Sequence, residues 1–152
     1  MRLCGQLLNG QNPHAAGLAL LESLYGTPLP EIRKTERGKP YFADGSAHFS
    51  ITHTPRHVFC VLSETPVGID AEELDRPIKL SLAEKILSPG ELTQFYKAQD
   101  KRRALLTFWV LKEAEAKCTG EGIKIHPNHT NFSLDDPRVQ KIDGCLVAVI
   151  EE

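Results

Sequence analysis

The sequence lacks the features that mark several large classes of protein. Its 18 Lys+Arg nearly balance its 20 Asp+Glu, whereas a dedicated nucleic-acid-binding protein normally carries a strong basic excess. No apolar stretch approaches the roughly 20 residues that a membrane span requires. These absences predict a cytoplasmic protein that binds neither nucleic acid nor membrane. The 152 residues, 41% of them hydrophobic, suffice for one domain with a buried core.

Closely spaced cysteines are also lacking. The four cysteines, Cys4, Cys60, Cys118 and Cys145, are scattered and form no CxxC pair. We therefore expect reduced thiols that pack as small apolar side chains, rather than disulfides or a zinc site. The segment 126–129 (HPNH) looks like half a metal site, but no cysteine or acidic partner lies close in sequence. We interpret it as a loop.

The pattern of apolar residues and turn formers places helices and strands in separate blocks. We expect helices at 14–25, from Ser81, from Ser88 and over 100–118, and strands at 31–33, 47–51, 57–63, 66–72, 130–134 and 144–150. The close spacing of the three middle strands favours an antiparallel meander. The helix at 100–118 is apolar on nearly every side, so it should be central and buried. Strands, then helices, then strands indicate an α+β fold.

A strand that carries two carboxylates is the most informative segment. Asp70 and Glu72 point to the same face because alternate residues of a strand do so. Gly68 lies on that face, where a missing side chain lets a ligand approach the backbone. Two carboxylates on one face repel unless a cation neutralises them, and oxygen ligands favour Mg²⁺ over Zn²⁺. The alternative is an exposed strand end with ordinary surface acids.

The long helix adds a narrow polar stripe. Trp109, Glu113 and Lys117 recur at every fourth residue and so share one side of the helix. A glutamate and a lysine on such an apolar helix are costly to bury without partners. We expect Glu113 to be the third carboxylate of the Mg²⁺ site and Lys117 to meet a phosphate. The alternative is an ion pair between Glu113 and Lys117 on the surface.

A third group of polar residues precedes the acidic strand. Lys39 stands between a glycine and a proline, on a constrained turn where its ammonium suits a phosphate. Thr52 and His53 stand at a strand end, where a hydroxyl and an imidazole can both donate to a phosphate. Taken separately, these residues are better explained as a turn lysine and a hydrogen-bonded histidine at a strand end.

Taken together, the order and spacing of these segments match a family. The sequence resembles the 4′-phosphopantetheinyl transferases of the surfactin-synthetase-activating (Sfp) type over roughly residues 14 to 150. The resemblance rests on residues 38–40 (GKP), 49–53 (FSITH), 67–72 (VGIDAE) and 109–117 (WVLKEAEAK). It implies an antiparallel sheet packed on a long central helix, in one domain spanning 1–152. Residues 1–45 would be a reduced first half and connector, and 46–152 the second half with the motifs.

The resemblance also implies a reaction and the residues that carry it. The 4′-phosphopantetheine arm of coenzyme A would pass to a serine of an acyl or peptidyl carrier protein, with release of 3′,5′-ADP. The implied metal ligands are Asp70, Glu72 and Glu113, the implied coenzyme A ligands are Lys39, Thr52, His53 and Lys117, and the implied catalytic residues are Glu113 and Lys117. Trp109 and Lys112 are interpreted as residues that pack and shape the site.

Other functions and partners remain open. A shortened homologue could bind coenzyme A or a carrier protein without transfer, and acids with a lysine also occur in metal-dependent nucleases. The lack of a basic excess disfavours the nuclease. The basic cluster Lys97, Lys101, Arg102 and Arg103 suits an acidic carrier helix and is equally typical of a solvated helix start. Because the first half is short for the family, the surface that it leaves uncovered is expected to be either exposed or covered by self-association.

Overall fold

The computed structural model describes residues 1–122 and 130–152, so the 126–129 segment lies outside the described residues. The strands are β1 (Arg2–Leu7), β2 (Ile32–Lys34), β3 (Pro40–Phe42), β4 (His48–His53), β5 (His57–Ser63), β6 (Val67–Glu73), β7 (Val139–Ile142) and β8 (Cys145–Glu151). The helices are α1 (Pro13–Tyr25), α2 (Ala83–Ile86), α3 (Pro89–Lys97) and α4 (Lys101–Thr119), with a 3-10 turn at Leu80–Leu82.

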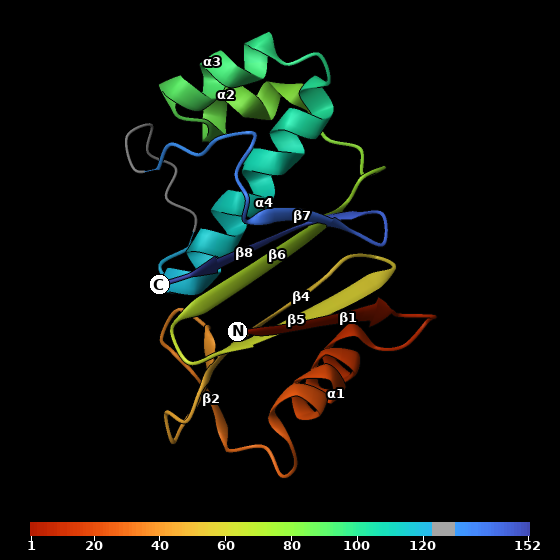
Figure 1. The fold of residues 1–152 in the computed structure, drawn as a ribbon, viewed down its shortest axis with the longest axis vertical. Coiled ribbons are helices and arrows are strands. Elements are labelled where there is room, and N and C mark those ends of the chain that lie inside the picture. The colour runs from red at the N-terminus through yellow and green to blue at the C-terminus, as the bar shows by residue number, and fades with distance from the viewer. Residues whose placement is uncertain (123–129) are drawn as a thin grey trace.

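Two antiparallel sheets form the middle of the fold and confirm the α+β prediction. One sheet has the strand order β1-β5-β4, the other has β6-β8-β7, and β2 pairs with β3 in a separate ribbon. Helix α1 lies on one side of the strands and α4 on the other (Figure 1). The sequence predicted one domain divided at residues 45 and 46, and this stays a prediction. The hydrogen-bonded sheets themselves change between β5 and β6.

The apolar core consists of three clusters, one in each space between neighbouring layers of helix and sheet. Leu21 of α1 packs against one face of β5, and Val61 on the other face of β5 packs against Ile69 of β6. Leu111 of α4 packs against Leu146 of β8 on the far side of the second sheet. The layers therefore run helix, sheet, sheet, helix, and strand β6 is covered on both faces.

Helix α4 is the long buried helix that the sequence predicts. The carboxylate of Asp100 accepts a hydrogen bond from the backbone N–H of Arg103 at 2.9 Å and so caps its start. The helix ends at Gly120, which has a positive φ of 73°. A Cβ on Gly68 would lie 2.0 Å from the Ala114 carbonyl oxygen. Gly68 therefore allows α4 to lie directly on β6, rather than allowing a ligand to approach as predicted.

The predicted meander is wrong in its third strand. Strands β4 and β5 pair as expected, but β6 leaves them and pairs with β8. The helix predicted from Ser81 begins at Ala83 instead, after a 3-10 turn, and Leu82 before it makes no side-chain cap. The helix predicted from Ser88 does begin there, with a capping box between Ser88 and Glu91. Strands β1, β3 and β7 were not predicted from the sequence.

The strand predicted at 130–134 is absent, because side chains of α3 take its backbone groups. The N–H of Phe132 donates to the Glu91 carboxylate at 3.0 Å, and the N–H of Leu134 donates to Gln94 at 3.0 Å. Glu91 is fully buried and also pairs with Lys112 of α4 at 2.9 Å. Lys112 thus ties α4 to α3, which gives the predicted packing role a specific partner.

Candidate active site

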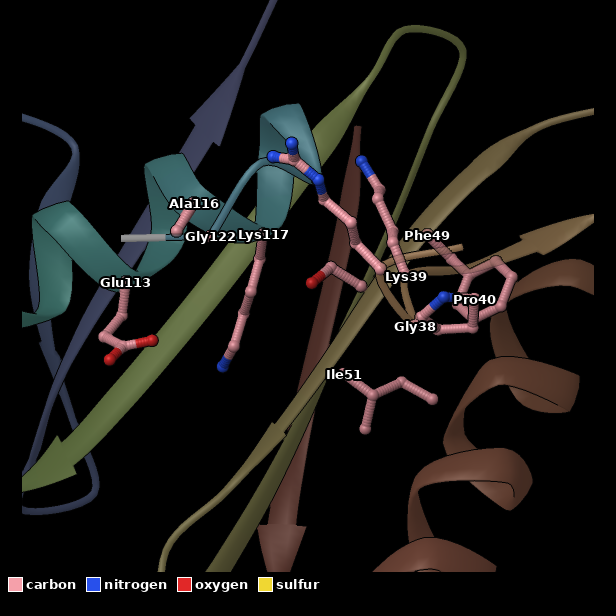
Figure 2. A pocket seen from close by; sticks show the side chains of 12 residues that line it. Gly38, Lys39, Pro40, Phe49, Ile51, Glu113, Ala116, Lys117 and Gly122 are labelled. Carbon is pink, nitrogen blue, oxygen red and sulfur yellow. The ribbon is translucent and has the colours of Figure 1, made fainter. Parts of the chain in front are cut away.

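Two adjoining pockets lie between α4 and strand β4, the first bordered also by β6 and the second by residues 37–40. We call the first, with a volume of about 400 Å³, the acid pocket; it is lined by Ile51, Thr52, His53, Asp70, Ala71, Glu72, Trp109, Glu113 and Lys117. The second, of about 350 Å³, is the lysine pocket, whose lining includes Arg37, Lys39, Ile51, Glu113 and Lys117. Because the pockets share lining residues, they form one groove. Figure 2 shows Glu113 and Lys117 projecting from α4 into the space that Lys39 borders from the other side.

Asp70 is the buried centre of the acid pocket. Its Oδ1 lies 2.6 Å from Lys117 Nζ and accepts a hydrogen bond from the Thr52 hydroxyl at 3.2 Å. Its Oδ2 is buried without a hydrogen-bond partner among the described residues. Burial raises the pKa of Asp70, although the nearby Lys117 and Thr52 act in the opposite direction. The lysine pairs with Asp70, so the predicted alternative of a Glu113–Lys117 surface pair is wrong.

The other two carboxylates of the pocket are half-buried. Burial raises the pKa of Glu113, and the charge of Asp70 raises it further. Burial also raises the pKa of Glu72, whose strongest opposing partner is Arg76. Arg76 forms an ion pair with Glu72 and stacks 5.9 Å from the Trp109 ring centroid. The three pKa values are raised for a common reason: the carboxylates are partly removed from water, and the nearby cations do not compensate fully for this.

The donor set fits a divalent cation that prefers oxygen. Carboxylate oxygens are the ligands of Mg²⁺ in proteins, and the unpartnered Oδ2 of Asp70 is a buried acceptor with no donor of its own. The three carboxylates face one pocket but are not tightly gathered. The group that brings three possible ligand atoms within 4.8 Å, among the described residues, is formed by His57, Glu73 and Cys145. Mutual repulsion between like charges opposes a closer approach of the pocket acids.

The predicted coenzyme A ligands lie along this groove in different settings. Thr52 is buried, and its hydroxyl accepts a hydrogen bond from Lys117 Nζ at 3.2 Å. His53 is exposed at the rim of the acid pocket. Lys39 lines the lysine pocket, and its ammonium donates to the Cys118 carbonyl at the end of α4. The structure thus brings every predicted site residue to one groove, while their roles stay predictions.

Two features of the site escaped the sequence analysis. Arg76 pairs with Glu72 from four residues away, a spacing that predicts contact on a helix, but here the chain leaves β6 between them. Arg37 donates to the Glu121 carbonyl at 2.9 Å and adds a cation to the lysine pocket. Its place in a basic loop was the only signal for this role.

The sequence was also compared with known families. The family model described as the 4′-phosphopantetheinyl transferase superfamily matches residues 66–146, which cover β6, α4 and most of the acid pocket. The chain belongs to this superfamily. Membership confirms the resemblance seen in the sequence, and with it the fold that the resemblance implies.

Several curated proteins similar to this chain are named 4′-phosphopantetheinyl transferases. The transferase gsp of Aneurinibacillus migulanus is 35% identical over 113 residues, which cover 73% of this chain and 46% of the relative. The transferase Sfp of Bacillus subtilis (strain 168) is 36% identical over 94 residues, covering 59% of this chain and 41% of the relative. This superfamily member therefore spans about half the length of the curated relatives it matches. None of its described helices is long and apolar enough to cross a membrane.

Proposed function

We propose that this chain transfers the 4′-phosphopantetheine arm of coenzyme A to a serine of a carrier protein and releases 3′,5′-ADP. The observation that carries the proposal is the buried, unpartnered Oδ2 of Asp70 in a pocket shared with Glu72, Glu113 and Lys117. A site that only held a nucleotide would have no need to bury carboxylates near the phosphates. The transferase names of the matched relatives support the same reaction.

The charges along the groove suit the two ends of coenzyme A. Arg37 and Lys39 give the lysine pocket cations that could bind the 3′-phosphate of the adenosine. The carboxylates of the acid pocket suit a pyrophosphate only if a metal ion lies between the like charges. Lys117 lies where the two pockets meet, and its ammonium can move from Asp70 to a phosphate oxygen.

Asp70, Glu72 and Glu113 would hold Mg²⁺ together with the pyrophosphate. When bound, the ion neutralises charge on the pyrophosphate and on the leaving 3′,5′-ADP. Thr52 keeps Asp70 and Lys117 in place through its two hydrogen bonds. Glu113, whose pKa is raised by burial, is suited to accept the serine proton, directly or through a water, because a base works best with a pKa near the working pH.

The test is incubation of this chain with coenzyme A, Mg²⁺ and a panel of apo carrier proteins, followed by intact-protein mass spectrometry. We expect one carrier to gain the mass of one phosphopantetheine arm. A carrier with its acceptor serine changed to alanine and a sample with the metal chelated are the controls, and neither should gain mass. If no carrier gains mass while coenzyme A still binds in calorimetry, the chain is a coenzyme A-binding homologue and the proposal is wrong.

Three further expectations belong to this proposal. The carriers of fatty-acid, polyketide and peptide synthesis are all candidates, and the panel distinguishes them. A cytoplasmic location agrees with the cysteines, which are all free thiols. Self-association remains a prediction; strand β1 lies at the edge of its sheet with Leu7 54% exposed, and light scattering measures the oligomeric state.

A further inference from the structure

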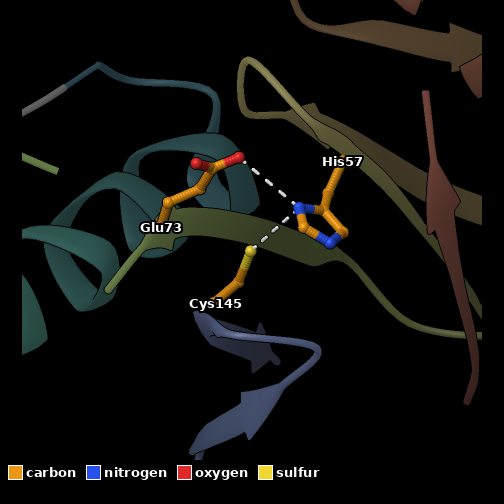
Figure 3. Close-up of side chains that lie close together, drawn as sticks. All are labelled: His57, Glu73 and Cys145. Atoms are coloured by element: carbon orange, nitrogen blue, oxygen red, sulfur yellow. Dashed lines mark hydrogen bonds and ion pairs between the residues drawn. The ribbon is translucent and has the colours of Figure 1, made fainter. Parts of the chain in front are cut away.

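A second cluster of ligand-forming side chains lies on the other face of β6. His57 begins β5, Glu73 ends β6 and Cys145 begins β8, so the cluster joins the two sheets at one end of the core between them. All three residues are buried. Figure 3 shows the carboxylate of Glu73 and the thiol of Cys145 on one side of the His57 imidazole, both directed at the same ring nitrogen. None of them lines the acid pocket or the lysine pocket.

The distances in this cluster match those of a tetrahedral metal site. His57 Nδ1 lies 3.4 Å from Glu73 Oε1 and 3.5 Å from Cys145 Sγ. Tetrahedral zinc bonds of about 2.0–2.1 Å to nitrogen, 2.0–2.2 Å to oxygen and 2.3 Å to sulfur place the ligand atoms roughly 3.3–3.6 Å apart. The carboxylate oxygen and the sulfur lie within 4.8 Å of each other. Small rotations of the side chains would bring all three atoms to bonding distance of one ion.

Within this group, hydrogen bonding leaves the imidazole of His57 the least well satisfied, since Glu73 Oε1 also accepts from the Thr54 hydroxyl at 2.8 Å and from the Arg56 backbone N–H at 3.0 Å. One ring nitrogen, His57 Nδ1, faces both neighbours. If Nδ1 carries a proton, it must share that proton between the carboxylate and the sulfur at two long distances. If it carries none, its lone pair faces a carboxylate oxygen, and its donor is the weak S–H of Cys145 at 3.5 Å. A cation at the centre would be attracted to all three atoms at once.

The surrounding charges also suit a divalent ion. Arg56 donates from Nε to Glu73 Oε2 at 2.6 Å and forms two hydrogen bonds to Asp75 at 2.8 and 2.9 Å. Arg56 forms ion pairs with both Glu73 and Asp75, so its single charge leaves one of these two carboxylates uncompensated. A divalent ion would then cancel one carboxylate and one thiolate, Glu73 and Cys145, with His57 neutral. The Glu73 oxygen opposite Arg56 is the one that faces His57, so the guanidinium need not leave.

The geometry points to a zinc-binding site formed by His57, Glu73 and Cys145, separate from the proposed magnesium site. One nitrogen, one oxygen and one sulfur ligand are typical of Zn²⁺ and unlike the all-oxygen set that Mg²⁺ prefers. Binding would release the thiol proton of Cys145 to solvent. Of the three ligands, His57 lines a neighbouring pocket of about 850 Å³, so an ion would enter past the imidazole. The site does not depend on the proposed transferase activity.

Cobalt(II), which takes the same ligands as zinc and absorbs visible light, tests the site. The chelator-treated chain is titrated with Co²⁺ in excess Mg²⁺, which occupies the acid pocket. We expect one equivalent to give a thiolate-to-cobalt charge-transfer band with tetrahedral ligand-field bands, and Zn²⁺ to remove both. The charge-transfer band should vanish in Cys145→Ser and persist in the matched control Cys60→Ser, another buried cysteine. Absence of the band in the wild-type chain, or its survival in Cys145→Ser, overturns the proposal.

A second variant covers the case in which Cys145→Ser does not fold. His57→Gln keeps the thiol and should weaken Co²⁺ binding on the order of a hundredfold or more. His48→Gln, which changes a histidine of the adjacent strand β4, should leave the affinity unchanged. Equal affinity in His57→Gln and the wild-type chain would place the metal elsewhere and overturn the proposal.

Discussion

Asp70 and Glu73 lie three residues apart on one strand, are each 6% exposed and have opposite electrostatic properties. Burial raises the pKa of Asp70, whereas Arg56 lowers the pKa of Glu73 to about 2. Asp70 faces α4, where one lysine and one hydroxyl serve only its Oδ1. Glu73 faces the other sheet, where both of its oxygens have donors.

The comparison teaches that burial by itself does not decide the state of a carboxylate. The number of hydrogen-bond donors and cations around the carboxylate decides whether it is charged. On the face of β6 that carries Glu73, donors from the chain itself satisfy the carboxylate. The exception in this cluster is His57 Nδ1, which two neighbours share. The face of β6 that carries Asp70 has an excess of negative charge, which a bound cation would have to neutralise. The magnesium ion proposed above would supply that neutralisation.

The largest expected effect is loss of transfer on removing a pocket acid. Asp70→Asn and Glu113→Gln, made separately, should each lower kcat/KM about 10²–10⁴-fold, because each change removes a metal ligand or the base. The rate of mass gain of the carrier protein measures this. Glu22→Gln on α1, an exposed position, is the matched control and should keep the wild-type rate. Near-normal, magnesium-dependent activity in either pocket variant would mean that the site is assigned wrongly.

The next largest effect concerns stability on the other face. Glu73→Gln should lower the free energy of unfolding by about 1–3 kcal/mol, because an amide places N–H groups where Arg56 and Thr54 already donate. Urea denaturation measures the loss. Glu64→Gln in the exposed turn before β6 should change the free energy of unfolding by no more than about 0.5 kcal/mol. Equal values for the two variants would show that the donors around Glu73 add nothing.

The two faces should also differ in their pH dependence. The pKa of Glu113 is raised above its ordinary value of 4.5, so the native state holds the proton longer than the unfolded state. Below pH 4.5 the Glu113 carboxyl is protonated in both the folded and the unfolded state, so its burial costs no stability. As the pH rises through the folded pKa, the free energy of unfolding falls. Glu113→Gln should therefore be more stable than the chelated wild-type chain at neutral pH, with the difference vanishing toward pH 4. Thermal denaturation across this range measures it.

Glu73 provides the opposite sign as an internal check. Because its folded pKa is about 2, its contribution to stability is complete above pH 4.5 and is lost as the pH falls toward 2.

Mg²⁺ added at neutral pH should raise the melting temperature of the wild-type chain more than that of Glu113→Gln. A wild-type chain that gains stability steadily from pH 4 to neutrality relative to Glu113→Gln would contradict the sign for Glu113.

The smallest expected effect is at the rim of the groove. His53→Ala should raise the KM for coenzyme A about tenfold and leave kcat unchanged, because an exposed imidazole contributes one hydrogen bond to binding. Steady-state kinetics with varied coenzyme A separate the two constants. A fall in kcat at constant KM would place His53 in the chemical step instead.

Several elements could be predicted from the sequence because their causes are local. The capping residues Ser88 and Asp100 start α3 and α4 where expected, and Gly120 ends α4. The alternation along β6 puts Asp70 and Glu72 on one face, as predicted. The failures involve distant partners. Residues 130–134 form no strand because Glu91 and Gln94 bind their backbone, and no local pattern announces that.

The sequence by itself determined which residues could share a face, because helix and strand periods depend on nearest neighbours along the chain. Tertiary structure decided what those faces meet. It paired Lys117 with Asp70 rather than with Glu113, and it left one oxygen of Asp70 without a donor. It also brought Cys145, which the sequence suggested was only a packing residue, to His57 from 88 positions away. Contacts at such separations follow from how sheets and helices pack, and local sequence does not encode them.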